Sequence, residues 1–69
     1  MTCKQYILEQ LKSKPNGLAG GVLEDNVRDL AGYKSSTVNR IAHTMAEEGE
    51  IQKGLFLVGK KKCVFFRAI

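Results

Sequence analysis

Apolar residues at the start of the chain recur at the spacing of a helix. Those that lie four residues apart, between about Thr2 and Ser13, are Cys3, Ile7 and Leu11. This period places them on one side of a helix and predicts a broad apolar stripe. The helix should end at Lys14–Gly17, since proline disfavours a helical residue before it and Asn-Gly tolerates left-handed turn geometry.

A second helix is predicted from about Val22 to Ala31, after a very short strand at Leu18–Ala19. The residues predicted to form its buried face, at helical spacing, are Leu23, Val27 and Leu30. Glu24 and Asp25 then fall in the first turn, where the helix dipole favours negative charge. Gly32 supplies the stop, because glycine adopts the positive φ that many helix C-termini require.

A third helix is predicted from about Ser35 to Glu48. Ser35 or Ser36 would cap its N-terminus, and Gly49 would close it. The apolar positions that repeat at three-to-four spacing are Val38, Ile41 or Ala42, and Met45.

The remaining sequence has the character of a β-hairpin. Two segments rich in Phe, Val, Leu and Ile, at Ile51–Val58 and Cys63–Ile69, are separated by the basic segment Gly59–Lys62. This arrangement predicts a hairpin with a basic tip. The predicted order, three helices and then a two-stranded hairpin, is of the α+β class and forms a single domain over residues 1–69.

The second and third helices are joined by only Gly32-Tyr33-Lys34. Two amphipathic helices with so short a link must cross steeply, as in a helix-turn-helix. The predicted core positions of this unit are Val27, Leu30, Tyr33, Val38, Ile41, Ala42 and Met45. The residues left outward are Ser35, Ser36, Asn39, Arg40, His43 and Thr44. This outer face is free of acids, as an approach to bases and phosphates requires, and Glu47, Glu48 and Glu50 gather at its far end.

The stretch from Val27 to Ile51 resembles the winged helix-turn-helix regulators of bacteria, archaea and their viruses. Those proteins have glycine in the turn, Thr-Val early in the recognition helix, arginine two residues later, and a leucine-like residue, glycine and isoleucine leading into the wing. The matching residues here are Gly32, Thr37-Val38, Arg40, Met45, Gly49 and Ile51. With the first helix and the hairpin, the likeness covers nearly the whole chain. It implies a winged helix that binds double-stranded DNA.

Two residues depart from that family pattern. Arg28 stands where the family usually has an alanine packed against the recognition helix, so the crossing is looser there or the arginine swings outward. Lys34 replaces the usual capping serine, which shifts the expected cap to Ser35 or Ser36.

A second resemblance lies inside the first. Val38-Asn39-Arg40 is similar to the Val/Ile-Asn-Arg element of Zalpha-type domains, winged helices that bind left-handed nucleic acid. Those domains have a tyrosine where His43 stands and consecutive prolines in the wing, whereas the one proline here is Pro15. Binding of Z-form nucleic acid is therefore a lesser alternative.

Charge is distributed unevenly along the chain. Residues 1–50 hold six Lys/Arg and seven Asp/Glu, a balance of −1, whereas residues 51–69 hold five Lys/Arg and no acid, a balance of +5. This asymmetry favours a polyanionic partner for the C-terminal part, without distinguishing DNA from RNA or an anionic membrane.

The size and residue content narrow the functional class. A chain of 69 residues has room for one modest core, which favours a binding module over an enzyme. The sequence has no apolar run that would span a bilayer and no signal-peptide pattern at its start, so we expect a cytoplasmic, nucleoid-associated protein with no membrane partner. Cys3, Cys63 and the lone His43 do not form a metal or catalytic pattern. We expect no cofactor, metal or small-molecule ligand and two reduced, partly buried cysteines, a disulfide being the alternative.

We predict a DNA-binding surface formed by the third helix, about residues 35–48, in the major groove and by the wing, residues 59–62, on the backbone or minor groove. The predicted contacts are Lys34, Ser35, Ser36, Thr37, Asn39, Arg40, His43, Lys60, Lys61 and Lys62. Several of these residues have a structural alternative. Arg40 would pair with an acid such as Asp29, and Ser35 or Ser36 would simply cap the helix. His43 would be merely solvent-exposed, and the wing lysines would only keep an exposed hairpin soluble.

Apolar residues fall on both faces of the predicted hairpin, and only one face can pack on the helices. Together with the broad stripe of the first helix, this predicts a homodimer through the first helix and the hairpin. The sequence thus favours a dimeric, sequence-specific transcriptional regulator. The alternative of a different class is a winged helix that binds protein rather than DNA.

Overall fold

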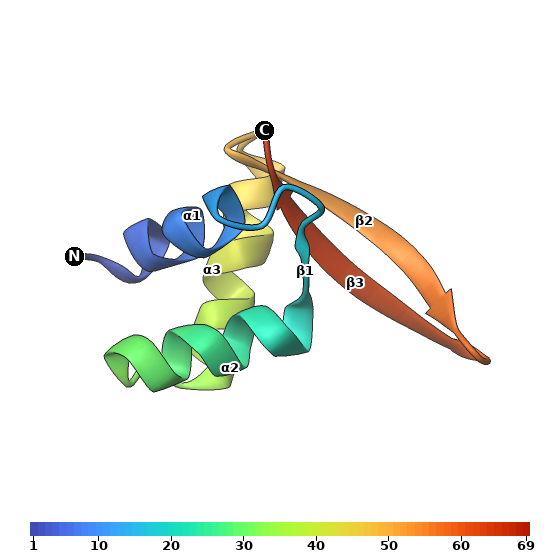
Figure 1. The fold of residues 1–69 in the computed structure, drawn as a ribbon, viewed down its shortest axis with the longest axis horizontal. Coiled ribbons are helices and arrows are strands. Elements are labelled where there is room, and N and C mark those ends of the chain that lie inside the picture. Colours follow the sequence, from blue (N-terminus) through green and yellow to red (C-terminus); the bar gives the residue numbers. More distant parts are fainter.

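The computed structural model describes all residues from 1 to 69 and confirms the α+β prediction (Figure 1). Three helices are followed by a long antiparallel hairpin, and a short strand between the first two helices pairs with it. The elements are α1 (Cys3–Lys12), β1 (Leu18–Ala19), α2 (Gly20–Ala31), α3 (Ser35–Glu47), β2 (Ile51–Val58) and β3 (Lys61–Ala68). No helix has the length and apolar character needed to span a bilayer.

Helix α1 begins at a capping box. The backbone N–H of Gln5 donates to Thr2 Oγ1 (3.3 Å), and the N–H of Thr2 donates to Gln5 Oε1 (2.8 Å). Two amides that the helix cannot satisfy itself are thereby paired. The predicted stripe of Cys3, Ile7 and Leu11 is buried.

Helix α2 starts two residues before the predicted position, so the prediction that Glu24 and Asp25 lie in its first turn is wrong. The chain passes directly from β1 into the helix at Gly20. A Cβ at Gly20 would lie 3.5 Å from the Phe66 ring, an ordinary van der Waals distance, so this residue packs against Phe66 without a steric requirement for glycine. The helix thus begins where β1 ends, and no acid lies in its first turn.

The prediction that Leu30 is a core residue is also wrong, since 58% of it is exposed. Leu30 lies in the last turn of α2, where it borders a shallow hollow with polar neighbours Gln10, Asn26 and Asp29. The other predicted face residues, Leu23 and Val27, are fully buried. The final turn of α2 therefore extends beyond the hydrophobic core.

The turn between α2 and α3 closes as predicted at its first residue. Gly32 adopts the left-handed conformation (φ 76°), and its N–H donates to the Arg28 carbonyl (2.8 Å). The predicted serine cap is wrong, because the extended N-cap position of α3 falls on Lys34 and no side chain caps the helix. Ser35 and Ser36 already belong to the first turn.

The end of α3 sets the direction of the hairpin. Gly49 has φ 79°, its N–H donates to the Ala46 carbonyl (3.2 Å), and the Glu50 N–H donates to Met45 (2.9 Å). These two bonds form a Schellman motif. The Glu50 carboxylate also accepts a hydrogen bond from Lys4 Nζ at 2.5 Å, which joins this turn to α1 and raises the pKa of the Lys4 ammonium.

The sheet has the strand order β1-β3-β2, with every neighbouring pair antiparallel. In the hairpin, Ile51 pairs with Ala68 at the base and Val58 with Lys61 at the tip. The turn is therefore only Gly59–Lys60. A positive φ at Gly59 alone (64°) is the signature of a type II′ turn. The predicted four-residue basic tip is wrong in extent, because Lys61 begins β3 and continued strand pairing takes the place of a loop.

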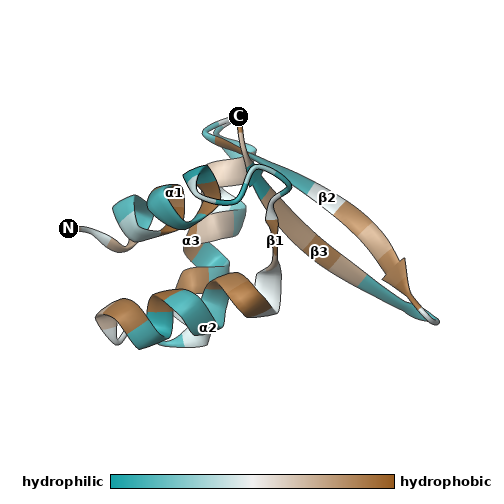
Figure 2. Ribbon diagram, viewed as in Figure 1, coloured by the Kyte–Doolittle hydropathy of each residue, from teal (hydrophilic) through white to brown (hydrophobic).

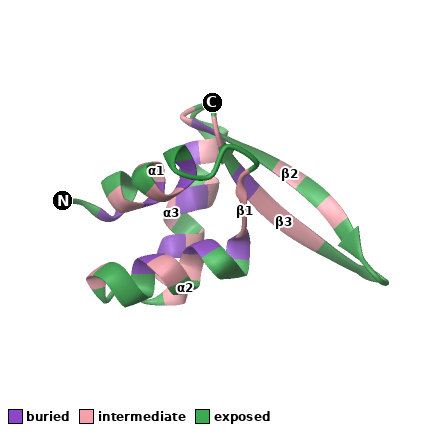
Figure 3. Cartoon of the chain, in the orientation of Figure 1, coloured by how far each residue is buried: buried purple, intermediate pink, exposed green.

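The core lies where the three helices meet the base of the hairpin (Figure 3). Its buried members are Cys3, Ile7, Leu11, Leu23, Val27, Val38, Ala42, Met45, Ile51 and Phe66. Tyr33 and Ile41 are half-buried against it, and the Tyr33 ring lies 6.3 Å from that of Tyr6. The two cysteines are free: Cys3 is buried and Cys63 is half-buried.

Candidate nucleic-acid interface

One line of α3 side chains faces away from the core. Ser36, Arg40 and Thr44 are exposed at successive turns of the helix. The opposite side carries the buried residues Val38 and Ala42, which hold the helix against the molecule. The Thr44 hydroxyl donates to the Arg40 carbonyl (3.0 Å), so it points along the helix rather than outward. Arg40 is thus the longest side chain at the middle of this exposed line.

Arg40 has no carboxylate within 4.0 Å, because the three ion pairs of the molecule are Lys4–Glu50, Arg28–Asp25 and Arg28–Asp29. The alternative that Arg40 pairs with Asp29 is therefore wrong, and Asp29 instead lies 3.8 Å from Arg28. The charge of Arg40 does act on Cys3. Burial raises the pKa of the Cys3 thiol, and the nearby guanidinium partly offsets this rise.

Arg28 swings outward, one of the two arrangements expected from its departure from the family pattern. Half of its side chain is exposed, and it lies 3.2 Å from Asp25 and 3.8 Å from Asp29 on its own helix. Its charge is therefore balanced locally on α2. Arg28 and Arg40 are both exposed, but Arg40 alone is free of carboxylates.

The first turn of α3 combines polar side chains with unpaired amides. Lys34 and Ser36 are exposed, and Ser35 and Thr37 are half-buried. No side chain caps this helix, and no acid lies in its first turn. The first amides of a helix have no partner within it and carry partial positive charge, so this end favours an anion.

His43 does not lie freely on the outer face of α3, as its position in the sequence suggested. It is half-buried, and its ring stands edge-on to the Phe66 ring with centroids 5.3 Å apart and an interplanar angle of 80°. The expectation of simple solvent exposure is also wrong. The packing arises because the hairpin crosses α3 on this side, which no local pattern in the sequence reveals.

Asn39 lies in a shallow groove between α3, the start of α2 and the hairpin. The lining residues are Ala19, Gly20, Gly21, Glu24, Asn39, Phe56, Val58, Cys63 and Val64. The sequence interpretation missed this groove, because it forms only where the start of α2, α3 and the hairpin meet in the fold. Because Glu24 contributes a carboxylate, the groove is less favourable to phosphate than the exposed line of Arg40.

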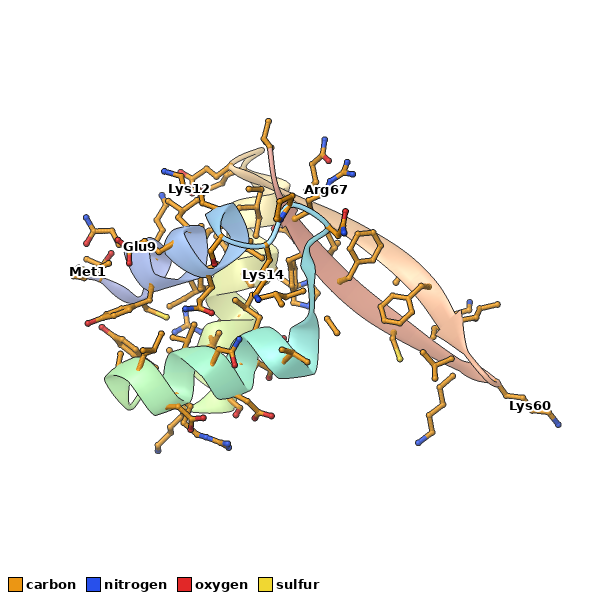
Figure 4. All side chains as sticks on the ribbon, viewed as in Figure 1. Met1, Glu9, Lys12, Lys14, Lys60 and Arg67 are labelled. Carbon is orange, nitrogen blue, oxygen red and sulfur yellow. The ribbon has the colours of Figure 1, made fainter.

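The three wing lysines do not form one cluster. Lys60 occupies the turn, whereas Lys61 and Lys62 are the first residues of β3 and therefore point to opposite faces of the hairpin. All three are exposed and have no ion-pair partner. Figure 4 shows Lys60 at the far end of the hairpin, away from the helices.

Arg67, at the other end of the hairpin, is held differently. Its guanidinium donates to Gln52 Oε1 through both Nε (3.1 Å) and Nη2. Gln52 is its partner across the strands. Three of the exposed, unpaired basic residues therefore lie together at the tip of the hairpin, and Arg40 is the one basic residue on the exposed line of α3.

Comparison with protein-family models, with curated proteins and with solved structures found no match to this chain. The assignment of the fold therefore depends on the molecule itself: three helices, a steep turn at Gly32 and an antiparallel hairpin that follows the third helix directly. These features are those of a small winged-helix-like α+β protein.

Proposed function

We propose that this protein binds double-stranded DNA, with α3 in the major groove and the hairpin as a wing on the backbone or minor groove. The observation that carries the proposal is the exposed, carboxylate-free guanidinium of Arg40 between Ser36 and Thr44. An arginine of this kind pairs with guanine or clamps a phosphate. The uncapped start of α3 adds a second favourable position for phosphate.

The wing supports the same proposal through charge. Its tip carries Lys60, Lys61 and Lys62 without an acid in strand β2 or β3. Lysines on an extended hairpin bind phosphates irrespective of base sequence and release counterions from the duplex. We infer that α3 supplies the base specificity and the wing supplies most of the salt-dependent affinity, as in a small transcriptional regulator.

A gel-shift titration with a random-sequence duplex at low salt tests this proposal. We expect a shift at micromolar protein that disappears as salt is raised. No shift at this concentration would refute DNA binding. Selection of bound duplexes from a random pool would then report the base sequence that α3 prefers. If no sequence is enriched, the protein binds duplex DNA without sequence specificity.

A winged helix that binds protein is the second candidate. The observation that favours it is the exposure of Leu55 (67%) and Leu57 (70%) on the hairpin. A duplex titration without a shift, together with an intact fold, would favour this candidate. The Zalpha-type alternative has less support, since His43 packs on Phe66 at the position where those domains have tyrosine. Titration with an alternating dC-dG duplex held in the left-handed form tests this alternative, since only a Zalpha-type domain should prefer that form to the right-handed duplex.

A further inference from the structure

Strand β2 forms an open edge of the sheet. Strand β3 lies between β1 and β2, so one side of β2 is paired and its other side is not (Figure 1). Over the eight residues Ile51–Val58, alternate backbone N–H and C=O groups therefore point away from the molecule. Such an edge is a template for pairing with another strand.

The outer half of this edge is apolar as well as exposed. Leu55, Leu57 and Val58 are 67%, 70% and 57% exposed. Figure 2 shows this part of β2 as hydrophobic, and Figure 3 shows most of it as exposed. Lys53 is the one charged residue within β2, and it lies toward the base of the strand. The edge is therefore poorly protected against a partner along its outer half.

Opposite charges lie beyond the two ends of β2. Glu47, Glu48 and Glu50 precede its first residue, and Lys60 follows its last, in the turn. In an antiparallel pair of β2 strands, the basic end of each copy lies beside the acidic end of the other. A parallel pair would instead bring lysine next to lysine and acid next to acid.

We propose that two copies of this chain pair through their β2 strands, antiparallel, about a two-fold axis normal to the sheet. The continuous sheet then has the order β1-β3-β2-β2-β3-β1. In a sheet, residues that lie opposite each other on neighbouring strands point to the same face. A register with Leu55 opposite Leu55 of the second copy meets this requirement. The same register sets Lys60 opposite Glu50 of the second copy, which also pairs with its own Lys4, and Glu48, which is in no ion pair, precedes Glu50 by two residues.

This pairing closes on itself. A two-fold contact uses the same edge on both copies, so neither copy offers a second β2 edge for further growth. The sheet that results is bordered by the two-residue strand β1 and the adjoining half of β3 at each side. The expected species is therefore a dimer and not a fibre. The proposal is independent of DNA binding, and its test contains no DNA.

Sedimentation equilibrium of the full chain tests the proposal. We expect a monomer–dimer equilibrium, and Leu55→Lys should raise its dissociation constant by about tenfold or more. The matched control is Leu30→Lys, since Leu30 is comparably exposed (58%) but lies on α2. It should leave the dissociation constant unchanged. Circular dichroism of both variants checks that the fold is intact.

Charge reversal tests the antiparallel arrangement separately. Lys60→Glu should weaken the dimer by placing acid beside acid, and Glu48→Lys in the same chain should restore it. A protein that is monomeric at every concentration, a dimer that survives Leu55→Lys, or assemblies larger than a dimer would each overturn the proposal. An unchanged dissociation constant for Lys60→Glu would overturn the antiparallel pairing.

Discussion

The His43 imidazole of α3 stands edge-on to the Phe66 ring of the central strand β3, with the two ring centroids 5.3 Å apart. Phe66 is itself in the core, and it also pairs with Leu18 of β1 and Lys53 of β2. One aromatic contact thereby connects the helix proposed to enter the groove with all three strands. We therefore expect this contact to help hold the hairpin in its orientation relative to α3.

Replacing His43 with alanine should lower the free energy of unfolding by about 1 kcal/mol, the typical value of an edge-to-face aromatic contact. The control is Thr44→Ala, which removes the exposed neighbouring side chain and should cost less. Chemical denaturation followed by circular dichroism measures both. A His43→Ala protein of unchanged stability would show that the ring contact contributes nothing to the fold.

Replacing Arg40 with alanine should weaken binding to a selected duplex by about 1–3 kcal/mol if the guanidinium contacts a base. Arg28→Ala is the matched control, because it removes the same charge from an exposed arginine that Asp25 and Asp29 already balance. Fluorescence anisotropy at fixed salt compares the two. Equal losses in both variants would mean that only net charge matters.

Each wing lysine replaced by glutamine should reduce the slope of log affinity against log salt by about 1 and weaken all sequences alike. Lys60, Lys61 and Lys62 are exposed and unpaired, so their charges are available to phosphates. Lys12→Gln on α1 is the control, since Figure 4 places this residue far from the hairpin tip. A slope that falls as much for Lys12→Gln would contradict a localised wing contact.

Two glycine substitutions should have opposite effects on stability. Gly17 has φ 85°, and a Cβ there would lie 2.5 Å from the Phe66 carbonyl oxygen, so Gly17→Ala should cost about 1–3 kcal/mol. Gly21 lies in α2 with open space around it, so Gly21→Ala should stabilise the protein by about 0.5–1 kcal/mol. Thermal unfolding of the two variants measures the contrast. A neutral Gly17→Ala would mean that the loop before β1 shifts without cost.

The Lys4–Glu50 pair predicts a pH dependence of stability. Glu50 raises the pKa of Lys4 above its ordinary value of 10.5, so the pair stabilises the fold below that pH. The contribution is lost as the pH rises through the raised value, because the folded state then releases the proton that it held more tightly. The melting-temperature difference between the native chain and Glu50→Gln should therefore shrink at high alkaline pH. Glu9→Gln, an exposed change on α1, should show no such trend.

The elements of the fold were predictable because their signals are local. The period of Cys3, Ile7 and Leu11, and the glycines at the ends of α2 and α3, are properties of short segments. The wrong predictions concern features that depend on packing against elements far away in the sequence. Helix α2 starts at Gly20 because it follows directly on β1, a strand that pairs with the distant strand β3, and Leu30 is exposed because no other element covers the end of α2.

The candidate interface was predictable to a smaller extent. The exposure of Arg40 follows from its position opposite Val38 and Ala42 on one helix. The absence of an ion pair at Arg40 does not follow from the sequence, since it depends on where the carboxylates lie in the folded chain, and none lies within 4.0 Å of Arg40. Predicting the contact between His43 and Phe66 would have required knowledge of the path of the hairpin, which only the folded structure gives.

The turn from α3 into β2 also determines where this chain can change in length. Both bonds of the Schellman motif and the buried residue Ile51 fall within the seven residues from Met45 to Ile51. One residue inserted there would turn the alternate side chains of β2 to the opposite face and take Ile51 out of the core. At Gly59–Lys60, by contrast, an added pair of residues only lengthens the hairpin. Insertions, whether natural or engineered, should therefore be tolerated at the hairpin tip and should destabilise the fold at Gly49.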